Sequence, residues 1–198
     1  MIVITNPSVI ANEISIIDSL FKEGLSLLHI RKPDFYELEI AQFIHQIKLE
    51  FRSKLVLHNH HQLADDFGIH RIHFSEKERK NGPDFPARFS KPCRYKSTAT
   101  HSVEDFNSLE NGFDYAFLSP VFTSISKEDY HPKANLFEAL KLRTNFNTKV
   151  IALGGIDSEN IEKTLSNGFD DVALLGSIWN HETPIKKFKL CQKIALSF

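Results

Sequence analysis

The chain has 198 residues, of which 41% are hydrophobic and 25% charged, a composition typical of a folded globular protein rather than a disordered one. Its 24 Lys and Arg residues nearly balance its 25 Asp and Glu residues, so net charge excludes a general charge-driven grip on nucleic acid or an anionic membrane. This length fits one domain, which we expect to span residues 1–198.

Short apolar runs alternate with helical segments along the whole chain. The runs begin near Ile2, Leu27, Leu55, Ile72, Tyr95, Tyr115, Val150 and Val172. Helical periodicity is clear around residues 38–47 and 161–169, and the residues expected to end helices are Gly24, Gly68, Gly112 and Gly168. The fourth helix, within residues 77–92, is expected to form poorly because this stretch contains several prolines.

Apolar runs of this kind suit parallel strands that helices cover on the outside. Eight strand–helix repeats close naturally into a single (β/α)8 TIM barrel, an α/β fold, and the alternative is an open doubly wound sheet. In such a barrel, ligands bind where the carboxyl ends of the strands meet. The residues that follow each apolar run are therefore the candidates for chemistry.

The compartment is predicted from the cysteines and the N-terminal segment. Cys93 and Cys191 lie far apart in sequence, which argues against a disulfide scaffold and a four-thiolate zinc site. The N-terminal MIVITNPS lacks the features of a secretory signal, and no apolar run reaches the roughly 18 residues of a membrane span. We expect a cytoplasmic protein with no membrane or nucleic-acid partner, and a homo-oligomer stays possible.

A candidate phosphate site follows the last two strands. The segment VIALGGI places Gly154 and Gly155 after the seventh run, and VALLGSI places Leu175, Gly176 and Ser177 after the eighth. Small residues there let backbone N–H groups approach an anion, so we interpret the two turns as a phosphate cup. The alternative is that the glycines only serve a tight turn.

The segment SPVFTSISK follows the sixth run and is rich in hydrogen-bond donors. Ser124, Ser126 and Lys127 lie in it, and their hydroxyl and ammonium groups could bind phosphate oxygens. Hydroxyl-rich loops also occur as ordinary turns. The predicted position of SPVFTSISK beside the phosphate cup favours a binding role for this segment.

Histidines offer the other candidate chemistry. His101 follows the fifth run, and an imidazole there could act as a general acid–base group, with helix capping or packing as the alternative. The segment HNHH, residues 58–61, invites a metal hypothesis. A strand sends alternate side chains to opposite faces, and no sequence feature supplies a convincing third ligand, so we expect no metal site there.

Six ordered segments together indicate a family. HIR, LVLHNHHQLA, THS, SPVFTSISK, VIALGGI and VALLGSI resemble the thiamine phosphate synthase family, which includes TenI-type thiazole tautomerases. The resemblance covers nearly the whole chain. It implies a small (β/α)8 barrel that binds a small-molecule thiazole phosphate, with the phosphate on the glycine turns after the seventh and eighth strands.

The sequence departs from the family pattern where synthases hold a diphosphate with Mg2+. The resemblance implies a Gln-x-Arg-x-Lys motif, in which this chain has His29, Arg31 and Pro33, and an Asn-Asp pair, in which it has His58 and Asn59. Replacing Asp with Asn removes charge that Mg2+ needs. If the chain is a synthase, Mg2+ is its cofactor and Asn59 and Glu78 are weak candidate ligands; otherwise we expect no cofactor.

These departures favour the tautomerase branch, which moves a proton on a carboxythiazole phosphate to make the ring aromatic. The resemblance implies His101 as its catalytic residue, with Arg31, His29 and Asn59 also contacting the substrate. Ala99 replaces a family Ser near the ligand. Two alternatives stay open: a thiamine phosphate synthase, and a non-catalytic thiazole phosphate-binding or regulatory protein.

Overall fold

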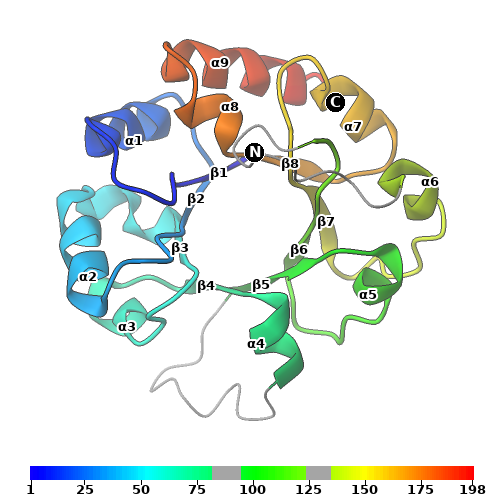
Figure 1. Cartoon of the computed structure of the whole chain (residues 1–198), viewed down its shortest axis with the longest axis horizontal. Helices are drawn as coiled ribbons and strands as arrows, with labels where there is room; N and C mark the ends of the chain where they lie inside the picture. The colour runs from blue at the N-terminus through cyan, green and yellow to red at the C-terminus, as the bar shows by residue number, and fades with distance from the viewer. Residues whose placement is uncertain (82–94, 124–134) are drawn as a thin grey trace.

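The strands and helices alternate in a computed structural model that describes residues 1–81, 95–123 and 135–198 (Figure 1). The strands are β1 (Ile2–Ile4), β2 (Leu27–Ile30), β3 (Leu55–Leu57), β4 (Arg71–Phe74), β5 (Tyr95–Thr100), β6 (Tyr115–Leu118), β7 (Lys149–Ala152) and β8 (Asp171–Leu174). The helices are α1 (Glu13–Lys22), α2 (Glu37–Gln46), α3 (Leu63–Phe67), α4 (Glu76–Asn81), α5 (Val103–Asn107), α6 (Leu136–Leu140), α7 (Ile161–Ser166), α8 (Gly176–Trp179) and α9 (Pro184–Ala195). A 3-10 helix, η1, spans Leu49–Lys54.

The sheet closes on itself, which makes the open-sheet alternative wrong. Each strand pairs in parallel with the next along the chain, and β1 also pairs with β8 through the registers Ile2↔Ala173 and Val3↔Leu174. Helices surround the ring of strands (Figure 1). The predicted (β/α)8 barrel is therefore confirmed, and the predicted starts of the strands agree with the observed ones to within one residue.

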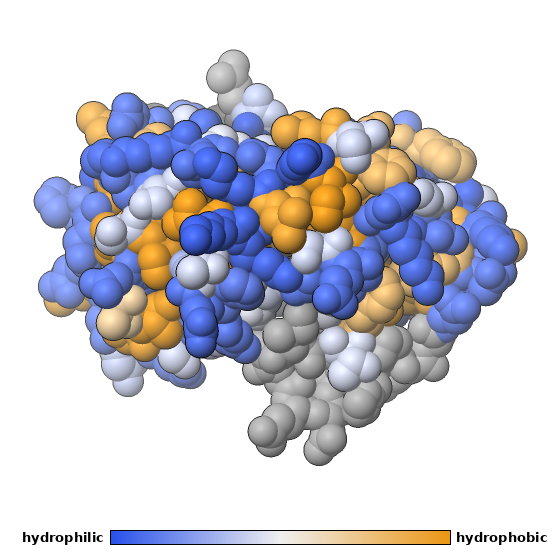
Figure 2. All heavy atoms as spheres, turned by 90° about the horizontal axis from the view of Figure 1, so that it is seen from above, coloured by the Kyte–Doolittle hydropathy of each residue, from blue (hydrophilic) through white to orange (hydrophobic). Residues whose placement is uncertain are grey.

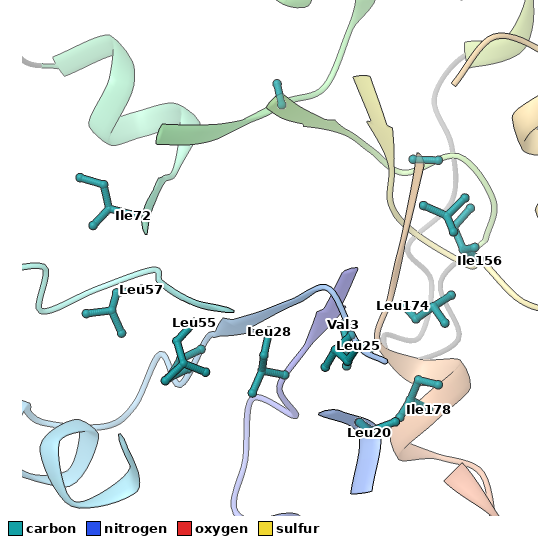
Figure 3. Packing of buried hydrophobic residues seen from close by; sticks show 14 of the residues in the cluster. Val3, Leu20, Leu25, Leu28, Leu55, Leu57, Ile72, Ile156, Leu174 and Ile178 are labelled. Atoms are coloured by element: carbon teal, nitrogen blue, oxygen red, sulfur yellow. The ribbon is translucent and has the colours of Figure 1, made fainter. Parts of the chain in front are cut away.

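The core has two layers, because successive side chains along each strand point alternately outward to the helices and inward to the barrel interior. Side chains such as Val3, Leu28, Leu57, Ile72 and Leu174 point outward and pack against the helices (Figure 3). A second, smaller cluster fills the inside of the barrel and comes from β1, β6, β7 and β8. At the matching inward positions β2, β4 and β5 carry polar residues, namely His29, His73 and Ser97.

The helix ends agree only in part with the expected glycine stops. Gly68 caps α3 in the left-handed conformation, and Gly24 and Gly168 lie two residues beyond α1 and α7. Gly112, by contrast, lies five residues beyond α5, because Ser108 already ends that helix. The helix α4 has six residues and is no shorter than α3, α5 or α6, and the prolines on which the expectation of a poor fourth helix rests lie in residues 82–94, outside the described part of the chain.

The protein surface is mixed in polarity. Figure 2 shows one face on which hydrophilic side chains separate smaller groups of hydrophobic ones. Among the described residues, no helix is both long and apolar enough to cross a membrane. The homo-oligomer stays a prediction.

One ion pair is buried beside the barrel. Lys32 follows β2 and is 0% exposed, and its Nζ donates to Glu13 Oε2 at 2.6 Å and to the Ser8 carbonyl at 2.9 Å. Burial raises the pKa of Glu13, while the hydrogen bond from Lys32 opposes that effect. The pair joins the start of α1 to the loop after β2, so it fixes this sector of the barrel mouth.

Removing one charge of this pair is expected to destabilise the fold. Glu13→Gln leaves the Lys32 ammonium buried without a counter-charge, which typically costs about 3–5 kcal/mol. Glu23→Gln is the matched control, because Glu23 pairs with Lys189 at the surface, where ion pairs contribute little. Urea unfolding measures both variants, and equal stabilities would contradict the structural role of the buried pair.

Candidate active site

A cavity of about 580 Å³ opens at the carboxyl ends of the strands. Residues of β1, β4, β5, β6 and β8 and of the segments that follow all eight strands contribute to its wall. The predicted site residues in the wall are Arg31, Asn59, Glu78, His101, Gly154, Gly155, Leu175 and Gly176. The expectation that chain-distant residues share one opening is therefore confirmed for these positions.

His101 follows β5 directly, and Ser102 caps α5 by accepting a hydrogen bond from the Asp105 N–H at 3.1 Å. The His101 Nδ1 lies 2.8 Å from the carbonyl oxygen of Ser119. A carbonyl can only accept, so Nδ1 carries the proton and Nε2 of the neutral ring has the free lone pair. The side chain is 48% exposed, so a ligand in the cavity can reach it.

Glu76 is a candidate residue that the sequence reasoning missed. Its Oε2 lies 3.7 Å from His101 Nε2. A hydrogen bond from Lys80 is the main cause that lowers the pKa of Glu76, so its carboxylate is charged at neutral pH. Such a charge stabilises the imidazolium that forms when His101 accepts a proton. The sequence feature that could have indicated Glu76 is the position of the segment SEKER, residues 75–79, directly after β4.

An ion pair between two helices holds Glu76 near His101. Arg79 on α4 donates to Asp105 Oδ2 on α5 at 2.6 Å and to the Thr98 hydroxyl at 3.2 Å. Since His101 lies between β5 and α5, this contact ties the helix that carries Glu76 to the segment that carries the imidazole.

Gly154 and Gly155 have a packing role that is independent of any ligand. Both have positive φ, +97° and +65°. A Cβ on Gly154 would lie 2.8 Å from Pro120 Cβ, and one on Gly155 would lie 2.7 Å from Phe122 Cβ. The loop after β6 thus approaches the turn after β7 closely. Larger residues here would disturb this packing, so substitutions at these glycines do not test phosphate binding cleanly.

The turn after β8 offers hydrogen-bond donors to the cavity. Leu175 and Gly176 lie in the wall at the start of α8, where the first N–H groups of a helix have no partner within it. Ser177 is 5% exposed, and its hydroxyl has no hydrogen-bond partner among the residues that the structure describes. An orphaned buried hydroxyl is costly unless a ligand or water satisfies it. Ser177 follows the wall residue Gly176 directly in the chain, so its hydroxyl is a candidate group for a polar ligand at this turn.

Three other predicted substrate contacts differ in position. Arg31 and Asn59 are in the cavity wall, with the Asn59 amide donating to the Lys32 carbonyl at 3.3 Å. His29 is 0% exposed and is not one of the residues in the cavity wall. A substrate in the cavity therefore does not contact its side chain in this structure, contrary to the prediction. The predicted residues of the loop after β6, Ser124, Ser126 and Lys127, lie outside the described residues.

His29 belongs to a cluster of three histidines, of which His29 lies on β2, His58 directly follows β3 and His73 lies on β4. Its Nδ1 lies 2.7 Å from His58 Nε2, and the rings of His58 and His73 stack with centroids 4.2 Å apart. One ring nitrogen from each residue lies within 4.8 Å of those of the other two. The expectation that His58 lacks a convincing third ligand is thereby corrected, because β2 and β4 supply the partners that HNHH does not contain.

The three imidazoles are neutral near pH 7. Burial is the largest cause that lowers the pKa of His29 and His58 well below the usual range, and their histidine neighbours lower it further. Burial likewise lowers the pKa of His73 to about 3. Each neutral ring therefore has one nitrogen whose lone pair can accept a hydrogen bond or bind a metal ion.

The described residues do not fit the Mg2+ site that the family resemblance implies for synthases. Mg2+ prefers oxygen ligands, chiefly carboxylates. Glu78 is the one carboxylate in the described part of the cavity wall, and its Oε2 already accepts from the N–H and hydroxyl of Ser75 at the start of α4. Pro33 supplies no cation for a diphosphate, and the neighbouring Lys32 is buried against Glu13.

Comparisons with known proteins agree with this barrel. A family model described as thiamine monophosphate synthase matches residues 1–178. The chain is 24% identical over 197 residues to a thiamine-phosphate synthase of Caldicellulosiruptor saccharolyticus. The alignment covers 94% of this chain and 86% of that protein.

Solved structures are similar as well. A thiamine phosphate pyrophosphorylase from Bacteroides thetaiotaomicron superposes with a TM-score of 0.78 at 29% identity, covering 98% of this chain and 96% of that one. One from Pyrococcus furiosus gives 0.81 at 18% identity, covering 99% and 95%, and shows the likeness of fold.

The histidine cluster is expected to make the fold sensitive to acid. The experiment is done in EDTA, so that no metal ion binds the histidines. In the folded protein His73 has a pKa of about 3 and is unprotonated at neutral pH, whereas in the unfolded chain a histidine has a pKa of about 6.5. The unfolded state therefore binds the extra proton as the pH falls, which lowers stability in this window. Between about pH 7 and about pH 5 this contributes a loss of about 2 kcal/mol.

The His73→Asn variant checks this contribution by urea unfolding at both pH values. Its stability should fall by about 2 kcal/mol less than that of the wild type over the same interval. His45→Asn, at an exposed position of α2, is the control and should leave the pH dependence unchanged. Equal pH dependence in the wild type and His73→Asn would show that His73 is not held neutral by burial.

Proposed function

Because the chain belongs to the thiamine monophosphate synthase family, we propose that it binds a thiazole phosphate in this cavity and acts as a thiazole tautomerase. The observation that carries the proposal is the geometry of His101. Its Nδ1 donates to Ser119, so the ring is held in the tautomer whose Nε2 can accept a proton from a bound ring carbon.

The remote phosphate would orient the ring for this step. Backbone N–H groups of Gly154, Gly155, Leu175 and Gly176 would bind it, and the buried Ser177 hydroxyl would gain a partner that the described residues do not supply. Binding energy from a group that does not react can position the reacting centre. Ser124, Ser126 and Lys127 stay predicted contacts from the loop after β6.

Arg31 and Glu76 would stabilise charges, one on the substrate and one on His101. Arg31 in the cavity wall would hold the substrate carboxylate, since a guanidinium binds carboxylates through two hydrogen bonds. His101 would take the ring proton at Nε2, and Glu76 would stabilise the resulting imidazolium. The proton then returns to the exocyclic carbon, which leaves the ring aromatic without a change in oxidation state.

A second candidate is thiamine-phosphate synthase, which the names of the relatives favour. That reaction joins an aminopyrimidine diphosphate to the thiazole phosphate and needs groups for the diphosphate. The described wall offers Arg31 but neither a carboxylate pair nor a lysine at position 33. The lack of these groups in the described wall supports our proposal of the tautomerase ahead of the synthase.

The two candidates are separated by one assay with two arms. The protein is incubated with the unaromatised carboxythiazole phosphate in EDTA, and then with aminopyrimidine diphosphate and Mg2+. We expect aromatisation in the first arm and no robust thiamine phosphate formation in the second. Strong Mg2+-dependent thiamine phosphate formation would identify a synthase, and tight binding without turnover in either arm would identify a binding protein.

His101→Gln tests the catalytic residue. General acid–base catalysis contributes roughly 10²–10⁴-fold, so aromatisation should slow by about that factor while thiazole phosphate affinity changes much less. The matched control is His45→Gln at the exposed position of α2, which should keep the wild-type rate. A folded His101→Gln variant that turns over normally, or that loses binding instead of rate, would remove His101 from the mechanism.

A further inference from the structure

The cluster of His29, His58 and His73 has the composition of a transition-metal site. Three neutral imidazoles with one open position are a ligand set that Zn2+ accepts in proteins. The three ring nitrogens already lie within 4.8 Å of one another, and metal–nitrogen bonds of about 2.0–2.1 Å need them to shift by roughly 1 Å. The cluster lies at the floor of the cavity, since His58 and His73 are in its wall.

Two of the nitrogens that face away from the cluster, those of His29 and His73, contact the hydroxyls of other side chains. His29 Nε2 lies 2.6 Å from the Tyr115 hydroxyl, and His73 Nδ1 lies 2.9 Å from the Ser97 hydroxyl. Metal-binding histidines almost always have such a partner on the second nitrogen, which fixes the ring and its tautomer. Both partners are residues of the barrel interior, on β6 and β5.

We propose that His29 Nδ1, His58 Nε2 and His73 Nε2 bind one first-row transition-metal ion, such as Zn2+ or Co2+, at the floor of the cavity. The short contact between His29 and His58 places one proton between these nitrogens. Metal binding would move that proton to the other nitrogen of its ring, so the three neutral imidazoles need lose no proton. This proposal does not depend on the thiazole reaction.

The surroundings determine which metal and which fourth ligand fit. Imidazole nitrogens suit Zn2+, Co2+ or Ni2+, whereas Mg2+ prefers carboxylate and water oxygens. His58 and His73 border the cavity, so the open position of the metal faces it. Arg31 lies near both histidines and adds positive charge there. The fourth ligand is therefore expected to be an anion, such as hydroxide or a carboxylate.

The test is Co2+ and Zn2+ binding by full-length, tag-free protein after removal of metals with EDTA. We expect one Co2+ per chain with the strong visible absorption of a four-coordinate nitrogen site, displaced by Zn2+ and not by Mg2+. Removing a ligand in His58→Asn or His73→Asn should weaken binding by at least about 100-fold, and Ser97→Ala by about 10–100-fold.

The control is His60→Asn, in the same segment as His58. His60 has a φ of 51°, which Asn tolerates, and its Nε2 contacts the Phe35 carbonyl rather than the cluster. This variant should bind Co2+ like the wild type. Circular dichroism verifies folding, and Ser97→Ala together with the wild-type spectrum decides the question if a histidine variant unfolds.

Two results would overturn the proposal. One is no stoichiometric binding, or a weak spectrum of water-coordinated Co2+, in the wild type, which would leave the cluster as a hydrogen-bonded network. The other is Co2+ binding of wild-type strength in each of the single variants His58→Asn, His73→Asn and Ser97→Ala. That result would place the ion on surface groups.

Discussion

Closure of the parallel barrel is the constraint on which every other feature depends. The pairing of β1 with β8 completes the ring, and parallel strands then present all their carboxyl ends at one opening. Arg31 and Gly176 are far apart in sequence, yet both lie in the wall of one cavity. The site is therefore assembled from segments that follow the strands of one closed ring, and some of these segments contact each other directly, as Lys32 does with Glu13 and Arg79 with Asp105.

The interior of this ring is divided between two kinds of filling. Aliphatic and aromatic residues from β1, β6, β7 and β8 pack one side, as in an ordinary barrel core. The other side holds three histidines that satisfy one another and the hydroxyls of Tyr115 and Ser97. Buried imidazoles with lowered pKa values reduce stability as the pH falls, so this polar half of the interior is expected to lower the acid tolerance of the fold.

Much of this architecture could be predicted from local sequence because apolar runs and turn glycines are local signals. The position of His101 after β5 followed from the STATHS segment in the same way. The histidine cluster could not be predicted so, because His29, His58 and His73 come from separate strands and meet only through the register of β2, β3 and β4. Glu76 was missed for a similar reason, since its contact with His101 joins the start of α4 to the segment after β5.

A crystal structure with the aromatic carboxythiazole phosphate tests the central claim most directly. The account predicts the phosphate on the turns at Gly155 and Gly176, within hydrogen-bond distance of the Ser177 hydroxyl, and the thiazole ring beside His101 Nε2. A phosphate bound elsewhere, or a ring too far from His101 for proton transfer even through one water, would contradict it.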